Sequence, residues 1–124
     1  MKLTVIVPCY NEEAALHFFY EEICKVMPSM PGVELELLFV NDGSKDGTLK
    51  IIKKLTEQDK RIKYVSFSRN FGKEAAIYAG LEYATGELTA IMDADLQDPP
   101  SLLPKMYQAI TEEGYDCVAS RRVD

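Results

Sequence analysis

The chain has 124 residues, of which 47% are hydrophobic and 27% are charged, and its net charge is −6 at neutral pH. That length fits one domain, and the apolar share is large enough to form a buried core, which argues against a disordered chain. The acidic balance argues against non-specific nucleic-acid binding, because such binding needs a basic face. No apolar run in the sequence approaches the roughly 20 residues that a membrane-spanning helix needs.

Apolar, β-branched runs that indicate strands alternate along the chain with patterns typical of helices. We expect strands over residues 3–8, 35–40, 62–67, 88–92 and 115–119. We expect helices to begin near Asn11, Asp46, Gly72 and the Pro99–Pro100 pair, with Asn11 and Asp46 as N-terminal caps. This alternation predicts an α/β fold, with a mostly parallel sheet and helices on both of its faces.

The cysteines and the single histidine carry little chemistry. Cys9, Cys24 and Cys117 are far apart and form no Cys-x-x-Cys pair, so we expect buried thiols in a reducing, cytoplasmic compartment rather than disulfides or a zinc site. His17 lies within a helical pattern, where a place on the helix surface or against a partner is expected rather than catalysis.

Polar clusters follow four of the expected strands, at 10–12, 41–42, 68–70 and 93–98. Ligands of parallel α/β sheets bind at the carboxyl ends of the strands, so we expect the functional site there. The sequence has no Gly-x-Gly-x-x-Gly, no Walker lysine motif and no Gly-x-Ser-x-Gly elbow, which argues against dinucleotide, P-loop and hydrolase sites.

The acidic stretch at 93–100 is the most informative of these clusters. Asp93 and Asp95 lie two residues apart just past an expected buried strand, and Gln97 adds a neutral oxygen. Hard oxygen ligands in this arrangement suit Mg²⁺ or Mn²⁺ and leave positions for substrate phosphates. A turn in which an aspartate caps the next helix is the other interpretation.

Asp42 begins a second acidic segment, which runs into a glycine turn at Gly43. A carboxylate at this place can accept hydrogen bonds from a nucleobase or a ribose. By spacing alone, a turn followed by a helix cap explains the segment equally well. A calcium-binding loop is a poor match, because Lys53 stands where a bidentate glutamate belongs.

Four motifs in this order resemble the family-two inverting glycosyltransferases, which have the A-type, Rossmann-like nucleotide-sugar fold. The motifs are Val-Pro-Cys-Tyr-Asn-Glu at 7–12, Asn-Asp-Gly-Ser-x-Asp-Gly-Thr at 41–48, Arg-Asn-Phe-Gly-Lys-Glu at 69–74 and Asp-x-Asp-Leu-Gln-Asp-Pro-Pro at 93–100. The last two are similar to the branch of dolichyl-phosphate mannose synthases and bacterial polyprenyl-phosphate (bactoprenol) glucosyltransferases.

The resemblance implies transfer of a hexose from a nucleotide diphosphate sugar, such as UDP-glucose or GDP-mannose, to a polyprenyl phosphate. It implies that the metal ligands are Asp93, Asp95 and Gln97, that the catalytic residues are Asp93, Asp95 and Asp98, and that the cofactor is Mg²⁺ or Mn²⁺. The nucleotide-binding residues that it implies are Pro8, Tyr10, Asn11, Glu12, Asp42, Lys73, Asp93 and Ala94.

Family members are longer, so we expect residues 1–124 to form a single donor-binding domain that is truncated at its C-terminal end. Arg121 or Arg122 is our candidate for the acceptor phosphate, with solvated charges at a frayed end as the alternative. We expect little or no turnover from this part alone, and an uncovered sheet face would favour a homo-oligomer. The longer parent is expected at the cytoplasmic face of the membrane. The alternatives are a sugar nucleotidyltransferase and a non-catalytic nucleotide-binding module.

Overall fold

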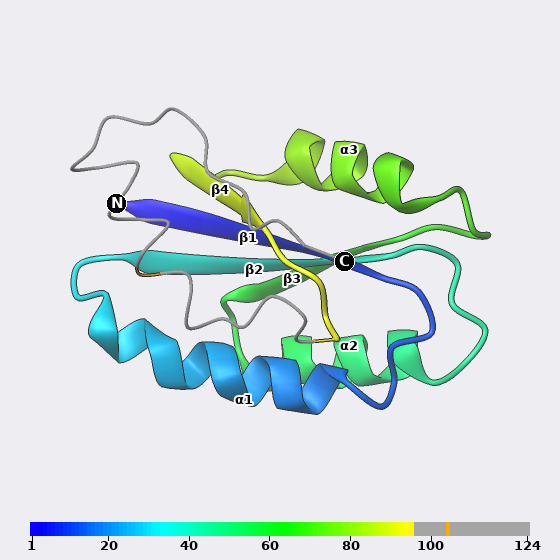
Figure 1. Cartoon of the computed structure of the whole chain (residues 1–124), viewed down its shortest axis with the longest axis horizontal. Helices are drawn as coiled ribbons and strands as arrows, with labels where there is room; N and C mark the ends of the chain where they lie inside the picture. Colours follow the sequence, from blue (N-terminus) through cyan, green and yellow to red (C-terminus); the bar gives the residue numbers. More distant parts are fainter. Residues whose placement is uncertain (96–103, 105–124) are drawn as a thin grey trace, which may run out of the picture.

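The computed structural model describes residues 1–95 and Pro104. The described part holds a four-stranded sheet in the order β3-β2-β1-β4, and every neighbouring pair of strands is parallel (Figure 1). The strands are β1 (Lys2–Cys9), β2 (Glu34–Asn41), β3 (Ile62–Ser66) and β4 (Leu88–Ile91). The expected parallel α/β fold is confirmed, and each of these strands lies within two residues of its predicted bounds.

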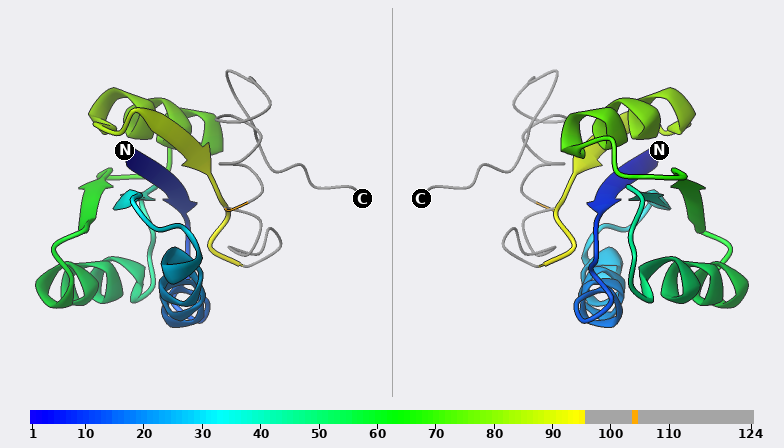
Figure 2. Two further views of the ribbon diagram at one scale, coloured as in Figure 1. Left: turned by 90° about the vertical axis from the view of Figure 1, so that its left-hand side faces the viewer. Right: turned by 90° about the vertical axis from the view of Figure 1, so that its right-hand side faces the viewer.

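The helices cover both faces of the sheet, as predicted. They are α1 (Leu16–Val26), the short 3₁₀ helix η1 (Met27–Ser29), α2 (Thr48–Gln58) and α3 (Lys73–Tyr83). Helices α1 and α2 lie on one face and α3 lies alone on the other, which the two end-on views make plain (Figure 2). Since parallel strands are joined by crossovers, their carboxyl ends and the loops that follow them gather at one edge of the sheet.

Two hydrophobic cores result from the alternation of side chains along the central strand β1. Val5 and Val7 belong to the larger core, beneath α1 and α2, whereas Ile6 belongs to the smaller core beneath α3. The small residues of α3 let it approach closely: a Cβ added to Gly80 would lie 2.5 Å from Cγ2 of Ile6. Burial on both faces explains why the strands read as almost continuous apolar runs.

The start of α1 differs from the prediction. The helix begins at Leu16, and no side chain caps it. Asn11 instead has a positive φ of 53°, and its side-chain Oδ1 accepts a hydrogen bond from the backbone N–H of Lys45 at 2.8 Å. The cap predicted at Asn11 is therefore wrong, because this side chain is used between two loops. The N-cap residue of α2 is Gly47 rather than the predicted Asp46, although Asp46 Oδ1 accepts from the N–H of Thr48, the first residue of α2, at 2.9 Å.

The sequence analysis missed a buried charge at the amino ends of the strands. Glu36 is 1% exposed, and its carboxylate accepts hydrogen bonds from Thr4 Oγ1 at 2.8 Å, Lys63 Nζ at 2.9 Å and the N–H of Thr85 at 2.9 Å. Burial by itself would raise the pKa of Glu36, but the hydrogen bonds from Thr85, Lys63 and Thr4 outweigh it and lower that pKa. Glu36 thereby anchors the connection between α3 and β4.

Several sequence predictions lie outside the described residues. They are the helix at Pro99–Pro100, the strand at 115–119 and Cys117. Within residues 1–95, Cys9 is buried, Cys24 is partly buried, and both are free thiols. His17 lies exposed on α1, as expected. No helix in the described part of the chain is long and apolar enough to cross a membrane. The extent of the domain stays a prediction.

Candidate functional site

A cleft of about 430 Å³ opens at the carboxyl ends of β1, β2 and β4, beside the start of α3. It is the edge at which the sequence places its polar clusters. The residues that line the cleft are Pro8, Cys9, Tyr10, Glu12, Asp42, Asn70, Gly72, Lys73, Asp93 and Asp95. Three crossovers thus bring to one place segments that are widely separated in the sequence.

The cleft collects most of the predicted site residues that the structure describes. Pro8, Tyr10, Glu12, Asp42, Lys73, Asp93 and Asp95 line it. Asn11 and Ala94 do not: Asn11 is tied to the neighbouring loop, and the Ala94 side chain is 1% exposed in the larger core. A role for Ala94 in nucleotide binding would therefore fall to its backbone. Gln97, Asp98, Arg121 and Arg122 lie outside the described residues.

Asp42 is a buried carboxylate of the cleft that accepts several hydrogen bonds. It is 3% exposed, and its Oδ1 accepts from the N–H of Phe71 at 2.7 Å. Its Oδ2 accepts from Asn70 Nδ2 at 3.0 Å and from the N–H of Gly72 at 3.1 Å. Three of the roughly four acceptor positions of a carboxylate are therefore filled by one loop. We call residues 70–72 the clasped loop, since Asp42 fastens it to the end of β2.

Two glycines allow this fastening. Gly43 has a φ of 69°, and a Cβ added there would collide with the backbone of Arg69 and Asn70. Gly72 has a φ of 103° and is the N-cap residue of α3. Both conformations lie in the region that glycine enters without steric cost. The glycine of the Asn-Phe-Gly segment indicates a loop at this place in the sequence. The sequence does not indicate that Asp42 is the residue that holds this loop.

The turn after β2 is also bound to the loop after β1. Ser44 Oγ accepts from the N–H of Asn11 at 2.9 Å, and Thr48 Oγ1 accepts from the N–H of Glu12 at 2.8 Å. Glu13 Oε2 in turn accepts from the N–H of Gly47 at 2.9 Å. These contacts confirm that the 41–48 segment is a structured turn leading into α2, and they fix the backbone that carries Glu12.

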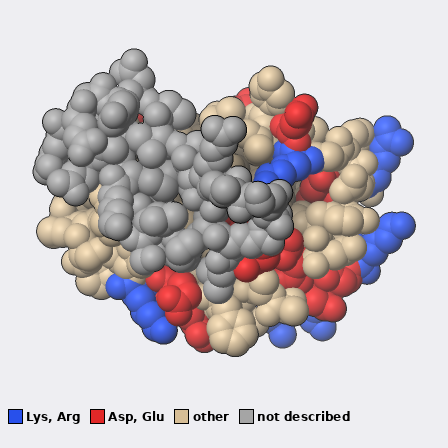
Figure 3. All heavy atoms as spheres, viewed as in Figure 1, with Lys and Arg blue, Asp and Glu red and all other residues tan. Residues whose placement is uncertain are grey.

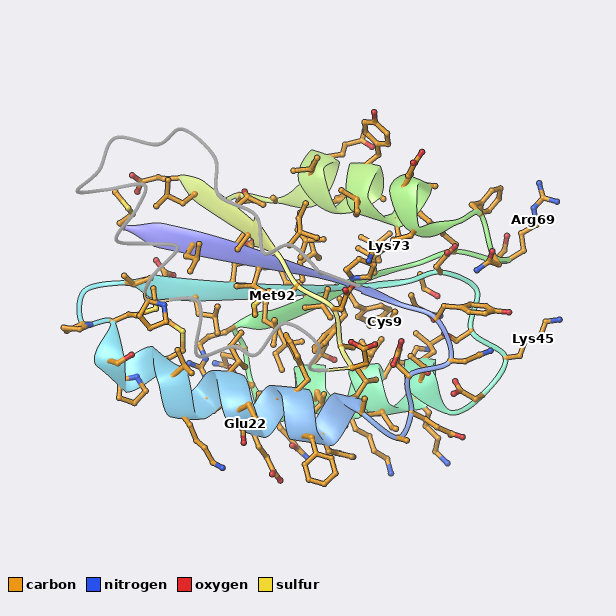
Figure 4. All side chains as sticks on the ribbon, viewed as in Figure 1. Cys9, Glu22, Lys45, Arg69, Lys73 and Met92 are labelled. Carbon is orange, nitrogen blue, oxygen red and sulfur yellow. The ribbon has the colours of Figure 1, made fainter. Side chains whose placement is uncertain are left out.

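One ion pair crosses the cleft. Lys73, the first residue of α3, places its Nζ 2.7 Å from Oδ1 of Asp93, which follows β4. Lys73 and Cys9 both line the cleft, whereas Figure 4 shows Lys45 and Arg69 extending outward at the edge of the molecule. Among the described residues that line the cleft, Lys73 is the one cation.

Acidic side chains dominate the remaining charge of the cleft. Burial raises the pKa of Glu12, and the charges of Asp95, Asp93 and Asp46 raise it further. Asp and Glu side chains gather at this end of the surface in Figure 3, with Lys and Arg toward the rim. The site therefore has an excess of negative charge that a bound cation would relieve.

The side chains of the cleft that could act as metal ligands fit Mg²⁺ or Mn²⁺ in part. Carboxylate oxygens from Glu12, Asp93 and Asp95 are the hard ligands that these ions prefer, and they line one cleft. Over residues 1–95, however, no three acidic, histidine or cysteine side chains already stand close enough together to hold a metal ion. The ligand set would have to close around the ion and take in further groups.

Comparison with known proteins agrees with this geometry. Residues 4–124 match the profile of the family described as Glycosyl transferase family 2. The chain belongs to glycosyl transferase family 2. A family relative, the uncharacterized glycosyltransferase YkcC of Bacillus subtilis, is 43% identical over 98% of this chain and 37% of its own length. The bactoprenol glucosyl transferase of Shigella phage SfX is 41% identical over 100% of this chain and 40% of its own length.

Solved structures of related glycosyltransferases have the same fold. The mannosyltransferase PcManGT of Pyrobaculum calidifontis, in complex with GDP-Man and Mn²⁺, has a TM-score of 0.73 and 27% identity over 89% of this chain and 32% of its own. S. aureus TarS 1-349, in complex with UDP-GlcNAc, has a TM-score of 0.71 and 30% identity over 91% of this chain and 32% of its own. The chain spans about two fifths of the length of the curated relatives that it matches.

Proposed function

We propose that this chain is the donor-binding part of a metal-dependent inverting glycosyltransferase that transfers a hexose from a nucleotide diphosphate sugar to a polyprenyl phosphate. One observation carries the proposal: at the carboxyl ends of three parallel strands, a cleft brings together Glu12, Asp93 and Asp95 with Lys73, the one lysine among its described lining residues. An acidic site of this kind suits a diphosphate that arrives with a divalent metal ion.

In this proposal the nucleoside lies between the loop after β1 and the clasped loop. Tyr10 is 43% exposed at the cleft, so its ring offers a surface for a base or a ribose. Asp42 shapes the wall opposite by holding the clasped loop, and it keeps one acceptor position for the nucleoside. Relatives with GDP-Man and with UDP-GlcNAc support a nucleotide sugar as the ligand class.

Asp93, Asp95 and Gln97 are the residues that would hold Mg²⁺ or Mn²⁺, and Asp98 is proposed as a catalytic residue together with Asp93 and Asp95. The bound cation would stabilise the charge that develops on the leaving diphosphate, and more strongly in the transition state than in the ground state. The Mn²⁺ in the complex of the Pyrobaculum mannosyltransferase supports this assignment. Lys73 contributes a second positive charge at the same end of the cleft.

The proposed acceptor follows from the names of the relatives and from the chemistry of the site. Several relatives are bactoprenol glucosyl transferases, and bactoprenol is a polyprenyl lipid. A phosphate monoester has a second pKa of about 6, so it is largely dianionic at neutral pH and can attack without a general base. That suits a described cleft without histidine. Arg121 and Arg122 are the proposed cations for this phosphate, and a lipid acceptor would place the longer parent at the cytoplasmic face of the membrane.

Calorimetric titration with UDP and with GDP tests the donor site. We expect binding to require Mn²⁺ or Mg²⁺, and Asp93→Asn and Asp95→Asn to weaken it in the presence of the metal. Glu22→Gln is the matched control, because Glu22 is a carboxylate on α1 that lies outside the described lining of the cleft and pairs with Lys25 on the surface. Equal nucleotide affinity with metal and with a chelator would refute the metal role.

Turnover separates the transferase from the two alternatives. Labelled UDP-glucose or GDP-mannose is incubated with a polyprenyl phosphate, using this chain and a full-length relative side by side. We expect transfer by the relative and very little by residues 1–124, since holding two substrates together supplies a large part of the rate. Nucleotide exchange with a sugar phosphate would instead favour the nucleotidyltransferase. Equal turnover by both chains would refute the proposal that residues 1–124 are the donor part alone.

A further inference from the structure

The Lys73–Asp93 pair suggests how the site remains intact before its ligands arrive. We propose that Lys73 acts as an exchangeable internal cation: its ammonium group pairs with Asp93 in the ligand-free chain and moves to the diphosphate when a divalent metal ion takes its place on Asp93. The inference rests on the proposed function, and it makes binding cooperative, because the metal ion and the nucleotide then bind tightly only together.

The charges of the cleft create the need for such a cation. Glu12, Asp93 and Asp95 line the same cleft, and Lys73 Nζ lies 2.7 Å from Asp93 Oδ1. A metal ion that reaches Asp93 on its own must first displace this ammonium group. A diphosphate that arrives on its own meets the carboxylates, and Lys73 turns to it only by breaking its ion pair with Asp93. Each ligand alone therefore meets an opposing charge that the other ligand removes.

The structure fixes the base of Lys73 and leaves its head group movable. Gly72, directly before it, donates its N–H to Asp42 Oδ2 at 3.1 Å, which holds the start of α3 against β2. The side chain of Lys73 is 60% exposed and that of Asp93 only 24%. A lysine is a compact charge on a flexible stem of four carbons, so its ammonium can move from a carboxylate to a nearby phosphate oxygen while its backbone stays in place.

The test measures binding of Mn²⁺ alone, of UDP or GDP alone, and of the two together, by calorimetry on four chains. The chains are the wild type, Lys73→Met, Lys73→Arg and Lys45→Met. Lys73→Met keeps the length of the stem and removes the charge. Lys45→Met removes the same charge from an exposed position outside the cleft, and so measures the general effect of net charge.

The expected result is a pair of opposite changes. Lys73→Met should bind Mn²⁺ alone more tightly, by roughly threefold, because the competing cation is gone and exposed ion pairs are of this strength. It should bind the metal–nucleotide pair more weakly, by roughly five- to tenfold, because a charged hydrogen bond to phosphate is lost. Lys73→Arg should keep both wild-type affinities within about twofold, as should Lys45→Met. Damage to the fold would weaken both kinds of binding and could not give opposite signs.

Two outcomes separate this inference from the proposed function. If the wild-type chain binds UDP and GDP with Mn²⁺, but Lys73→Met binds Mn²⁺ alone no more tightly than Lys45→Met does, the exchange of the ion pair is refuted and the donor site stands. If the wild-type chain binds neither nucleotide in the presence of Mn²⁺, the proposed function fails, and this inference fails with it.

Discussion

Replacing Asp42 with alanine is the sharpest test of how the cleft is built. The buried carboxylate accepts hydrogen bonds from the backbone N–H groups of Phe71 and Gly72 and from the side chain of Asn70. Asp42→Ala removes all three hydrogen bonds at once. The clasped loop would then lose its attachment to β2, and the start of α3 would lose a fixed point.

The loss of stability in Asp42→Ala can be worked out from these contacts. The Asn70 side chain is at the surface and can turn to water, so its loss counts little. The two backbone N–H groups lose a charged acceptor, at about 1–2 kcal/mol each after partial access to water. We therefore expect a loss of about 2–4 kcal/mol in the free energy of unfolding, which lowers the Tm by roughly 10 °C for a domain of this size.

Urea unfolding measures the total loss, and amide hydrogen exchange locates it. We expect lower protection at Phe71 and Gly72 in Asp42→Ala, while the amides of β1 exchange in proportion to global stability alone. Asp42→Asn is the matched variant, since it keeps the volume and one acceptor oxygen, and it should fall between the wild type and Asp42→Ala.

Nucleotide affinity distinguishes two roles of Asp42. If it only holds the clasped loop, affinity should fall in step with the loss of protection at Phe71 and Gly72. If it also binds the nucleoside directly, Asp42→Ala should lose a further ~1–3 kcal/mol of binding free energy. Unchanged stability and unchanged protection in Asp42→Ala would refute the clasp. Unchanged nucleotide affinity would leave Asp42 as part of the turn only.

Three other predictions follow from the same structure. The hydrogen bonds that lower the pKa of Glu36 below its usual value stabilise the fold above pH ~4.3, and this stability is lost as the pH falls through the lowered pKa. Glu36→Gln should lower the free energy of unfolding by about 2–4 kcal/mol at pH 7, measured by urea unfolding. The stability of Glu36→Gln should also fall less steeply in acid than that of the wild type. Gly43→Ala should lower the free energy of unfolding, measured by urea unfolding, by more than about 2 kcal/mol, because the added Cβ would collide with the loop after β3. Gly32→Ala is the control: Gly32 has a φ of 82° but lies in open space, so the loss there should be about 1 kcal/mol. Burial and then the charge of Asp95 raise the pKa of Glu12, so Glu12→Gln should raise the Tm of the ligand-free chain at neutral pH, and an unchanged or lower Tm would contradict this.

The sequence by itself determined the α/β class and the elements of the sheet. A strand covered on both faces must be apolar at nearly every position, as in β1 and β2, and that pattern is local. The polar residues that follow such strands then had to gather at one edge, because parallel strands end on the same side. The general place of the cleft and seven of its predicted residues followed from that rule.

Tertiary structure decided what each polar residue binds. A local pattern reports which face a residue occupies, but it does not report the partner that a crossover brings there. Asp42 meets the clasped loop, Asn11 meets Lys45 rather than its own helix, and Glu36 meets a lysine of β3. Each pair is distant in the sequence and close in space because β2 lies between β1 and β3. The ion pair of Lys73 with Asp93 has the same origin, since only the packing of α3 on the sheet brings the start of that helix to the end of β4.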